Sequence, residues 1–296
     1  MSTQDPSAPP EMQSKSASKR RPLKIAALWL ATLAVAGVYL FATRPAPLAD
    51  GLGAGRTVPV EKVFRMLAAE NDIARALWTA EIVAAGGKAG LKFHEKWREA
   101  NVQAGPLPAL FLREAATAVQ KTRIPLGLFL GSDFPLAQSN LFSGAQAEHF
   151  RQVRVAGNPE FFFAPDIGRY TAMFADLAVA PGCVSCHNEH PNTPKNDWKL
   201  NDIMGATTWS YPKDKVTIEE MMQIVGALRS GFAAAYEAYL AKVATFEKPP
   251  EIGERWPREG YYLPSREVFI REFERRASSG TVGKFLHALD EAPATQ

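Results

Sequence analysis

The chain has 296 residues, of which 46% are hydrophobic and 22% are charged, an ordinary composition for a folded globular protein. Its formal net charge of +3 is too small to indicate a nucleic-acid partner, and much of the positive excess comes from the N-terminal residues Lys15, Lys19, Arg20, Arg21 and Lys24. Only two cysteines are present, which is too few for a secreted fold that depends on disulfides.

The first 43 residues predict a membrane anchor. Residues 1–22 are polar and rich in serine, proline and lysine, so we expect a disordered cytoplasmic tail. Residues 25–42 read IAALWLATLAVAGVYLFA without a charge, and with their flanks (23–43) they have the length of about 20 residues that a transmembrane helix needs. Because the basic cluster precedes this run, the rest of the chain is expected on the periplasmic side of a bacterial inner membrane. A cleaved signal peptide is the alternative, and it leads to the same compartment.

A linker over residues 44–56 is expected to lead into the main domain, residues 57–213. Hydrophobic residues recur at three- and four-residue spacing from Val60 to Ile82 and predict a helix that Gly86 and Gly87 interrupt. A second amphipathic helix is expected over residues 108–120. The runs LGLFLGSDFP, EFFFAPDIGRYTAMFADL and MGATTWSYP then predict strands of an antiparallel sheet.

Helical spacing returns in residues 214–296, which we expect to form a helical C-terminal extension. Residues 217–246 predict one long helix, with Thr217 and Glu220 as a capping box. Two shorter helices are expected within residues 265–291. The predicted fold class is therefore α+β, with an antiparallel sheet flanked by helices, one N-terminal transmembrane helix and a helical extension at the C-terminal end.

The motif that indicates chemistry is CVSCH at residues 183–187, the C-x-x-C-H pattern of c-type haem attachment. In that chemistry the thiols of Cys183 and Cys186 add to the two vinyl groups of one porphyrin, and His187 is held where its imidazole can bind the iron. One motif predicts one covalent haem c. A thioredoxin-like site would need a βαβ context and a zinc site a second pair of ligands, while a plain disulfide would leave His187 unexplained.

A longer run around this motif resembles a known family. Residues 183–191 (CVSCHNEHP), 194–199 (PKNDWK) and 202–205 (DIMG), with support from residues 126–132 and 170–176, are similar to the single c-type haem, PAS-like periplasmic sensor domains of bacteria. The resemblance covers about residues 59–212. It implies a small PAS-like antiparallel sheet packed by the N-terminal helix, with a haem beside it. Sensor members continue into a kinase, cyclase or methyl-accepting module, whereas this chain continues into the helical extension.

The sixth ligand of the iron stays open in the sequence. In some relatives it is a cysteine of the N-terminal helix, but both cysteines here belong to the motif. Met66 is the closest substitute in position and would raise the potential as a ligand, with a core methionine as the alternative. His94 and His149 can be read as ligands or as surface histidines, and Met173 and Met204 are equally well explained by packing.

Three further residues are expected near the haem. The resemblance places Trp198 at the haem edge and makes Lys195 a propionate partner, with a solvated surface lysine as the alternative. His190 lies only three residues after His187, a reach of about 10 Å, so it cannot comfortably bind the opposite face of the porphyrin. It is expected to contact a propionate or to cap the turn before Pro191.

These features predict a non-enzymatic, membrane-anchored c-type cytochrome that senses redox state or a diatomic gas. A single-electron transfer cytochrome that serves a membrane redox partner is the alternative. We expect a protein redox or signalling partner in either case, and a vacant or water-bound position on the iron would admit a gas such as NO or CO. A peroxidase would need an acid–base pair over an open iron, and the sequence does not identify one.

Overall fold

The computed structural model describes residues 29–30, 32–35, 56–257 and 263–291. The chain forms two compact units, Met1–Leu52 and Gly53–Gln296. In the first unit, residues 29–30 and 32–35 are helical, whereas the predicted tail (1–22), most of the predicted anchor (23–43) and nearly all of the predicted linker (44–56) lie outside the described residues. No helix within the described ranges combines the length and the hydrophobicity needed to span a membrane.

The second unit is an α+β fold built on a four-stranded antiparallel sheet, which confirms the predicted class. The strands are β2 (Gly127–Gly131), β3 (Glu160–Ala164), β4 (Arg169–Leu177) and β5 (Ile203–Tyr211), in the spatial order β2-β5-β4-β3. The three sequence runs that predicted strands supply all four. Strand β1 (Thr57–Pro59) pairs with β6 (Lys215–Thr217), and the short strands β7 (Ile252–Gly253) and β8 (Leu263–Pro264) pair in parallel.

The first long helix corrects one prediction. Helix α2 (Val60–Leu77) continues through the π-helical segment η1 (Trp78–Ala84) into α3 (Ala85–Lys88), so Gly86 and Gly87 lie inside a continuous helical stretch. Gly86 is buried, and a Cβ atom on it would come within 2.8 Å of Leu91 Cδ1. The glycine is therefore explained by a close approach of the following loop rather than by a helix end.

The other predicted helices are found, with one correction. Helix α4 (Pro108–Gln120) begins with proline in its first turn, and α7 (Ile218–Val243) is capped by Thr217, whose hydroxyl accepts the Glu220 N–H at 3.1 Å. The prediction of two short helices near the C-terminal end was wrong, because α8 (Arg266–Glu291) is one helix of 26 residues. Its contacts with α2 and α7 hold it continuous through Gly280 and Gly283, which are poor helix formers.

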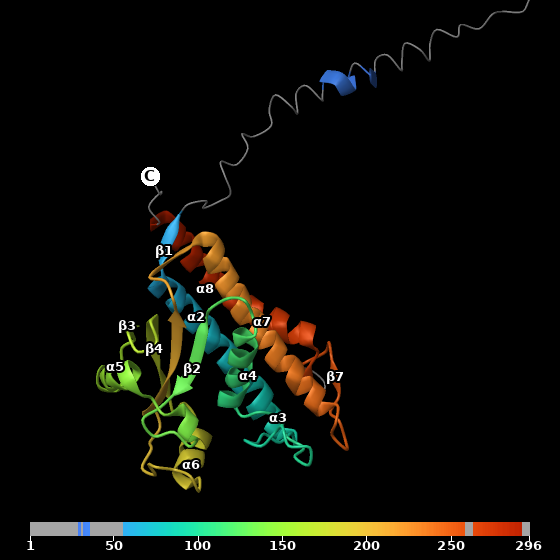
Figure 1. Cartoon of the computed structure of the whole chain (residues 1–296). Coiled ribbons are helices and arrows are strands. Elements are labelled where there is room, and N and C mark those ends of the chain that lie inside the picture. Colours follow the sequence, from blue (N-terminus) through green and yellow to red (C-terminus); the bar gives the residue numbers. More distant parts are fainter. Residues whose placement is uncertain (1–28, 31, 36–55, 258–262, 292–296) are drawn as a thin grey trace, which may run out of the picture. The chain divides into compact units, whose positions relative to one another are not determined.

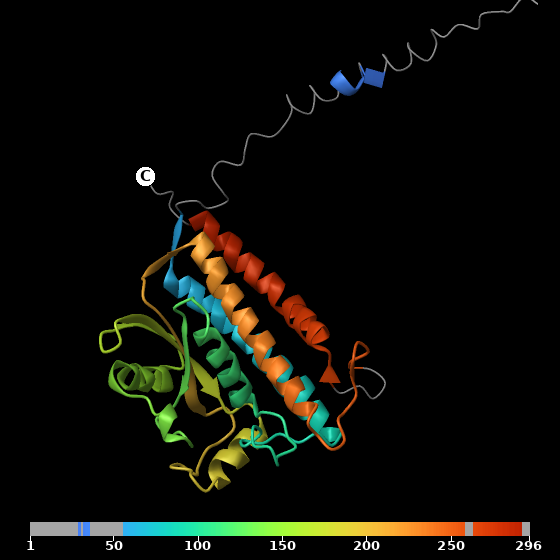
Figure 2. The same ribbon diagram turned by 45° about the vertical axis from the view of Figure 1, so that its right-hand side comes forward.

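The sheet separates two hydrophobic clusters. The larger one lies between one face of the sheet, which contributes Ala172 and Trp209, and the layer of α2, α4, α7 and α8. The smaller one lies on the other face, where Phe150 and Val153 of α5 (Gly144–Ala156) pack on Met173 and Ala206. Figures 1 and 2 show this layering, with α2, α7 and α8 running side by side. The predicted C-terminal extension therefore shares the main core of this unit.

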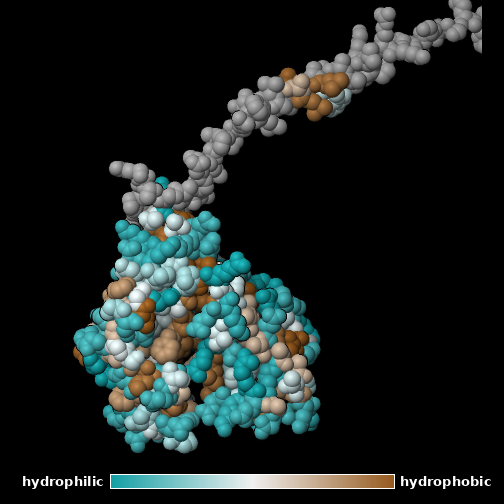
Figure 3. All heavy atoms as spheres, viewed as in Figure 1, coloured by the Kyte–Doolittle hydropathy of each residue, from teal (hydrophilic) through white to brown (hydrophobic). Residues whose placement is uncertain are grey.

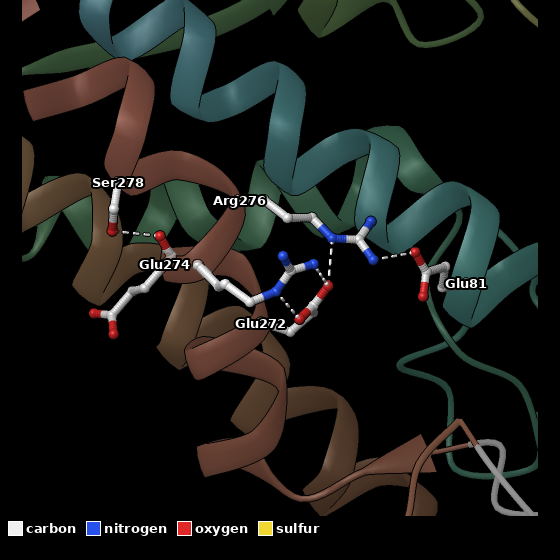
Figure 4. Close-up of polar contacts among 6 residues, drawn as sticks. Glu81, Glu272, Glu274, Arg276 and Ser278 are labelled. Carbon is white, nitrogen blue, oxygen red and sulfur yellow. Dashed lines mark hydrogen bonds and ion pairs between the residues drawn. The ribbon is translucent and has the colours of Figure 1, made fainter. Parts of the chain in front are cut away.

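Two polar clusters fix α8 to the helices around it. Arg276 of α8 binds Glu81 of η1 and also Glu272 one turn earlier, as Figure 4 shows. Glu70 of α2 is 1% exposed and accepts hydrogen bonds from Arg229 of α7 and from the hydroxyl of Thr281 in α8. The Glu70 carboxylate thus joins three helices at one point.

Candidate functional site

The CVSCH motif lies in helix α6 (Pro181–Glu189), in the connection between β4 and β5. The helix begins with Pro181, whose fixed φ suits a first helical turn, and it ends at the non-helical His190. Residues three and four positions apart occupy the same face of a helix. The helix therefore presents Cys183, Cys186 and His187 on one face.

Both thiols of the motif are accessible to chemistry. The structure contains no disulfide between them; Cys183 is partly exposed and Cys186 is exposed. Desolvation raises the pKa of the Cys186 thiol, and the nearby carboxylate of Glu95 acts in the same direction. Because Cys183 and Cys186 are three residues apart in a helix, their sulfur atoms are neighbours on its surface. Both can therefore be attached to one planar group.

His187 has an unused ring nitrogen. The side chain is partly buried, and its Nδ1 atom is inaccessible to solvent yet has no hydrogen-bond partner among the described residues. Desolvation lowers the pKa of His187, and the neighbouring His190 lowers it further, which favours the neutral imidazole. Neutral imidazole is the form that binds a metal ion. A partly buried, neutral imidazole with a ring nitrogen that no described residue uses fits a metal ligand.

Exposed apolar side chains flank α6 in the chain. Leu177 and Val179 precede the helix and are 43% and 64% exposed, and Leu200 follows it at 51%. Hydrogen bonds between Ala178 and residues 201 and 202 hold the two flanking segments next to each other. Figure 3 shows hydrophobic side chains gathered around a hollow between the sheet side of the molecule and the helical side. An apolar, planar group attached to α6 would cover this kind of surface. The residues present therefore fit a haem c.

Asn188 folds the chain after α6 back onto the helix. Its side-chain Nδ2 donates to the Trp198 carbonyl at 3.0 Å, and its Oδ1 accepts the Trp198 N–H at 2.8 Å. Trp198 is 5% exposed, and Lys195 Nζ lies 4.7 Å from the centre of its ring while also pairing with Asp197. The structure thus brings the predicted residues Trp198 and Lys195 to α6. Sequence reasoning missed the role of Asn188, because a side chain that forms two hydrogen bonds with one distant backbone position has no spacing pattern.

His190 serves the turn and a loop contact. Its Nδ1 accepts the N–H of Asn192, just after Pro191, at 3.1 Å, and its Nε2 lies 3.0 Å from Glu95. Glu95 belongs to the loop between α3 and α4, so this contact ties α6 to the end of the helical layer. Both ring nitrogens of His190 are used in these contacts, and its contact with a propionate stays a prediction.

Met66 lies on the side of α2 that packs against α7 and α8, not at α6. It is 2% exposed and lines a cavity of about 270 Å³ with residues of α7 and α8, including Met221, Val225 and Phe285, and no residue of α6 lines that cavity. Met66 and Glu70 are one helical turn apart, and Glu70 also faces α7 and α8. The structure does not bring Met66 to His187, and its burial suits a core methionine.

The other candidate ligands have partners of their own. His149 stacks on Phe162, with ring centres 3.6 Å apart, and its Nδ1 lies 3.4 Å from Glu160. His94 Nδ1 accepts the N–H of Lys96 at 3.0 Å. Met173 packs in the hydrophobic cluster under α5. None of these three is placed by a contact at α6 in the part of the chain that the structure describes.

A cavity of about 290 Å³ lies between α2 and the sheet, and we refer to it as the α2–β4 pocket. Its walls come from α2, the C-terminal half of β4, β5 and the turn before β3; the lining residues are Ala68, Asn71, Asp72, Gly157, Pro159, Phe174, Ala175, Asp176, Leu177, Ile203 and Thr207. Asp176 accepts hydrogen bonds from Arg75 and from the Thr207 hydroxyl. Leu177, in the wall of this pocket, is four residues before Pro181, the first residue of α6.

The comparison with known families agrees with this site. Residues 69–212 match the model of the Tll0287-like family, which is described as Tll0287. This range contains the four-stranded sheet and all of α6, and it ends before β6, α7 and α8. The matched part is thus similar to a family of c-type cytochrome sensor domains. No curated protein and no solved structure matches the chain.

Proposed function

We propose that this protein is a monohaem c-type cytochrome in which Cys183 and Cys186 hold the porphyrin and His187 binds the iron. The observation that carries the proposal is the common face of α6, where two accessible thiols adjoin an imidazole with an orphaned buried nitrogen. The match of residues 69–212 to a cytochrome-like family supports it. When bound, the haem would supply a one-electron redox centre held by these three residues.

The surrounding residues give the haem its environment. The side chains of Leu177, Val179 and Leu200 would be covered, and Trp198 would pack near the edge of the porphyrin. Lys195 would exchange its surface pairing with Asp197 for a propionate. Desolvation keeps the His187 imidazole neutral and ready to bind the metal. The protein contributes covalent attachment, orientation and a low local dielectric, and we propose no catalytic role.

The sensing of redox state or of a diatomic gas is the proposed role of this haem. The uncharged run at residues 25–42 would anchor the protein in the inner membrane, with the haem domain in the periplasm and a signalling or redox protein as partner. Single-electron transfer is the second candidate, favoured by the exposure of Cys186, because an accessible haem edge suits electron exchange. Spectra of the reduced protein with and without CO distinguish the two: a large CO-dependent shift supports sensing, and an unchanged six-coordinate spectrum supports transfer.

The attachment is tested by producing the full chain in cells with a cytochrome c maturation system. We expect the intact mass to increase by one haem and the colour to stay with the protein after acid–acetone extraction. The C183A and C186A variants should each lose one thioether bond and the double variant should lose the haem. The S185A variant changes an exposed position of the same helix and serves as the control, with a full haem content. Complete extraction of colour from the unaltered protein would refute the proposal.

A further inference from the structure

Asn71 of α2 holds a buried hydrogen-bond acceptor without a donor. The residue is 1% exposed, and its Oδ1 atom has no hydrogen-bond partner in the part of the chain that the structure describes. Buried polar atoms in folded proteins are nearly always paired, because an unpaired one loses its hydration without compensation. The adjacent Glu70 is equally buried, yet it accepts from Arg229 and Thr281. The unpaired oxygen of Asn71 therefore marks a position where a donor belongs.

The α2–β4 pocket, which Asn71 lines, is rich in acceptors. The carboxylates of Asp72 and Asp176 also belong to its wall. The Thr207 hydroxyl, another group of the wall, donates to the two oxygens of Asp176 at 3.0 and 3.1 Å. A water molecule would bring lone pairs as well as donors, and this wall has few donors to meet them. The pocket is therefore suited to a group that donates hydrogen bonds and accepts none.

The charges around the pocket favour a cationic donor. Arg75 binds Asp176, and its positive charge also acts on Asp72, as does that of Lys284 in α8. The pKa of the Asp72 carboxyl is nevertheless raised, because desolvation outweighs both cations and the charge of Asp176 acts in the same direction. A positively charged donor in the pocket would compensate this carboxylate, whereas an anion would be repelled by it.

The rest of the wall and the size of the pocket define the remainder of the ligand. The wall also contains the apolar side chains of Ala68, Pro159, Phe174 and Ile203, and the cavity of about 290 Å³ admits only a small molecule. Leu177, which is 43% exposed, lies in the wall as well, so the pocket can be reached from solvent. A protonated primary amine has three N–H donors and no acceptor, and a short alkyl chain matches the apolar wall.

We propose that the α2–β4 pocket binds a small primary amine as its ammonium ion, which donates hydrogen bonds to the Oδ1 atom of Asn71 and to the carboxylate of Asp72. These two acceptors are consecutive in α2, and Asp176 of β4 forms part of the same wall. No residue of α6 lines the pocket among the residues described. The amine is therefore not a ligand of the proposed haem, and this site does not depend on the haem assignment.

The test is isothermal titration of the full chain, produced with its cofactor, with butylammonium chloride. Tetramethylammonium chloride at the same ionic strength is the matched probe, because it has the charge but no N–H donor. We expect one saturable site for butylammonium and none for tetramethylammonium. N71L removes the acceptor at similar side-chain size and should weaken binding about tenfold, and D72N should weaken it by at least about threefold. N101L and D214N make the same changes at exposed positions outside the pocket and should bind like the unaltered protein.

The outcomes separate this site from the proposed function. If butylammonium shows no saturable binding, if tetramethylammonium binds equally well, or if N71L keeps the affinity of the unaltered protein, the amine site is overturned. Should N71L fail to accumulate, N71A removes the same oxygen and is measured in its place, with the same expected loss and the same refuting result. The haem content of each sample, measured by the pyridine haemochrome assay, tests the attachment of the haem independently of these titrations.

Discussion

The carboxylate of Glu70 provides the sharpest test of how the helical layer is held together. It is 1% exposed and accepts from Arg229 Nε at 3.0 and 3.2 Å, from the second Arg229 nitrogen at 2.5 Å, and from the Thr281 hydroxyl at 2.6 Å. The R229M variant keeps most of the aliphatic packing and removes the positive charge. It leaves a buried carboxylate with a single remaining donor, Thr281.

The magnitude follows from the burial of the pair. Removal of one partner from a buried ion pair costs about 3–5 kcal/mol, because the other charge stays in a medium of low polarity. The Arg229 side chain is 27% exposed, so water can partly replace it and the lower end of that range applies, about 3 kcal/mol. For a folded unit of this size, such a loss corresponds to a decrease of roughly 6–12 °C in melting temperature.

The assay is thermal unfolding of the haem-loaded chain, followed by circular dichroism. The matched control is R266M, which makes the same substitution in a surface pair with Glu237, where the atoms are 3.9 Å apart and the effect should be about 0–1 kcal/mol. The E70L/R229M double variant removes both charges and should recover most of the lost stability. If R229M melts within 2 °C of R266M, this buried pair does not organise α2, α7 and α8.

Three further predictions concern single positions. G105A would place a Cβ atom 2.4 Å from a ring carbon of Tyr239, so we expect a loss of about 1–3 kcal/mol in the urea unfolding free energy. N188A removes both hydrogen bonds to the Trp198 backbone, so a lower yield of covalent haem is expected from the haemochrome assay. Hydrogen bonds from two neighbouring arginines lower the pKa of Glu272 to about 2, so its contribution is complete above the unfolded-state value of 4.5 and is lost as the pH falls towards 2. E272Q should therefore be slightly less stable at pH 7 and equal to the unaltered protein near pH 2, as melting curves at several pH values will show.

Local sequence patterns predicted the parts of the fold that local forces determine. The strands β2 to β5 follow from short β-branched and aromatic runs between turn residues, and the start of α7 follows from the capping hydroxyl of Thr217. The two errors have a common cause. Gly86 and Gly280 are poor helix formers, yet Gly86 is accommodated by the close approach of Leu91, and α8 is supported along its length by α2 and α7. Propensity alone cannot show where such packing partners will be.

The site was predictable where it is contiguous in the chain. The attachment motif spans five residues, and helical spacing alone places its two thiols and imidazole on one face. The prediction for Met66 depended on which side of α2 faces the haem, and α2 is buried on several sides, so its hydrophobic spacing does not distinguish them. The consecutive polar residues Glu70, Asn71 and Asp72 were the available sign that this helix has polar surroundings on more than one side.

Through the adjacent residues Glu70 and Asn71, helix α2 contacts both the helical layer and the pocket beside the sheet. Glu70 binds α7 and α8 through Arg229 and Thr281, and Asn71 faces the pocket beside the sheet. Because the Glu70 carboxylate holds the backbone of α2 against two other helices, the next residue is presented to the pocket in a fixed position. A pocket wall that is already rigid lowers the free-energy cost of ordering side chains when a ligand binds. Helices α7 and α8, which lie outside the family match, therefore hold α2 in place beside this pocket.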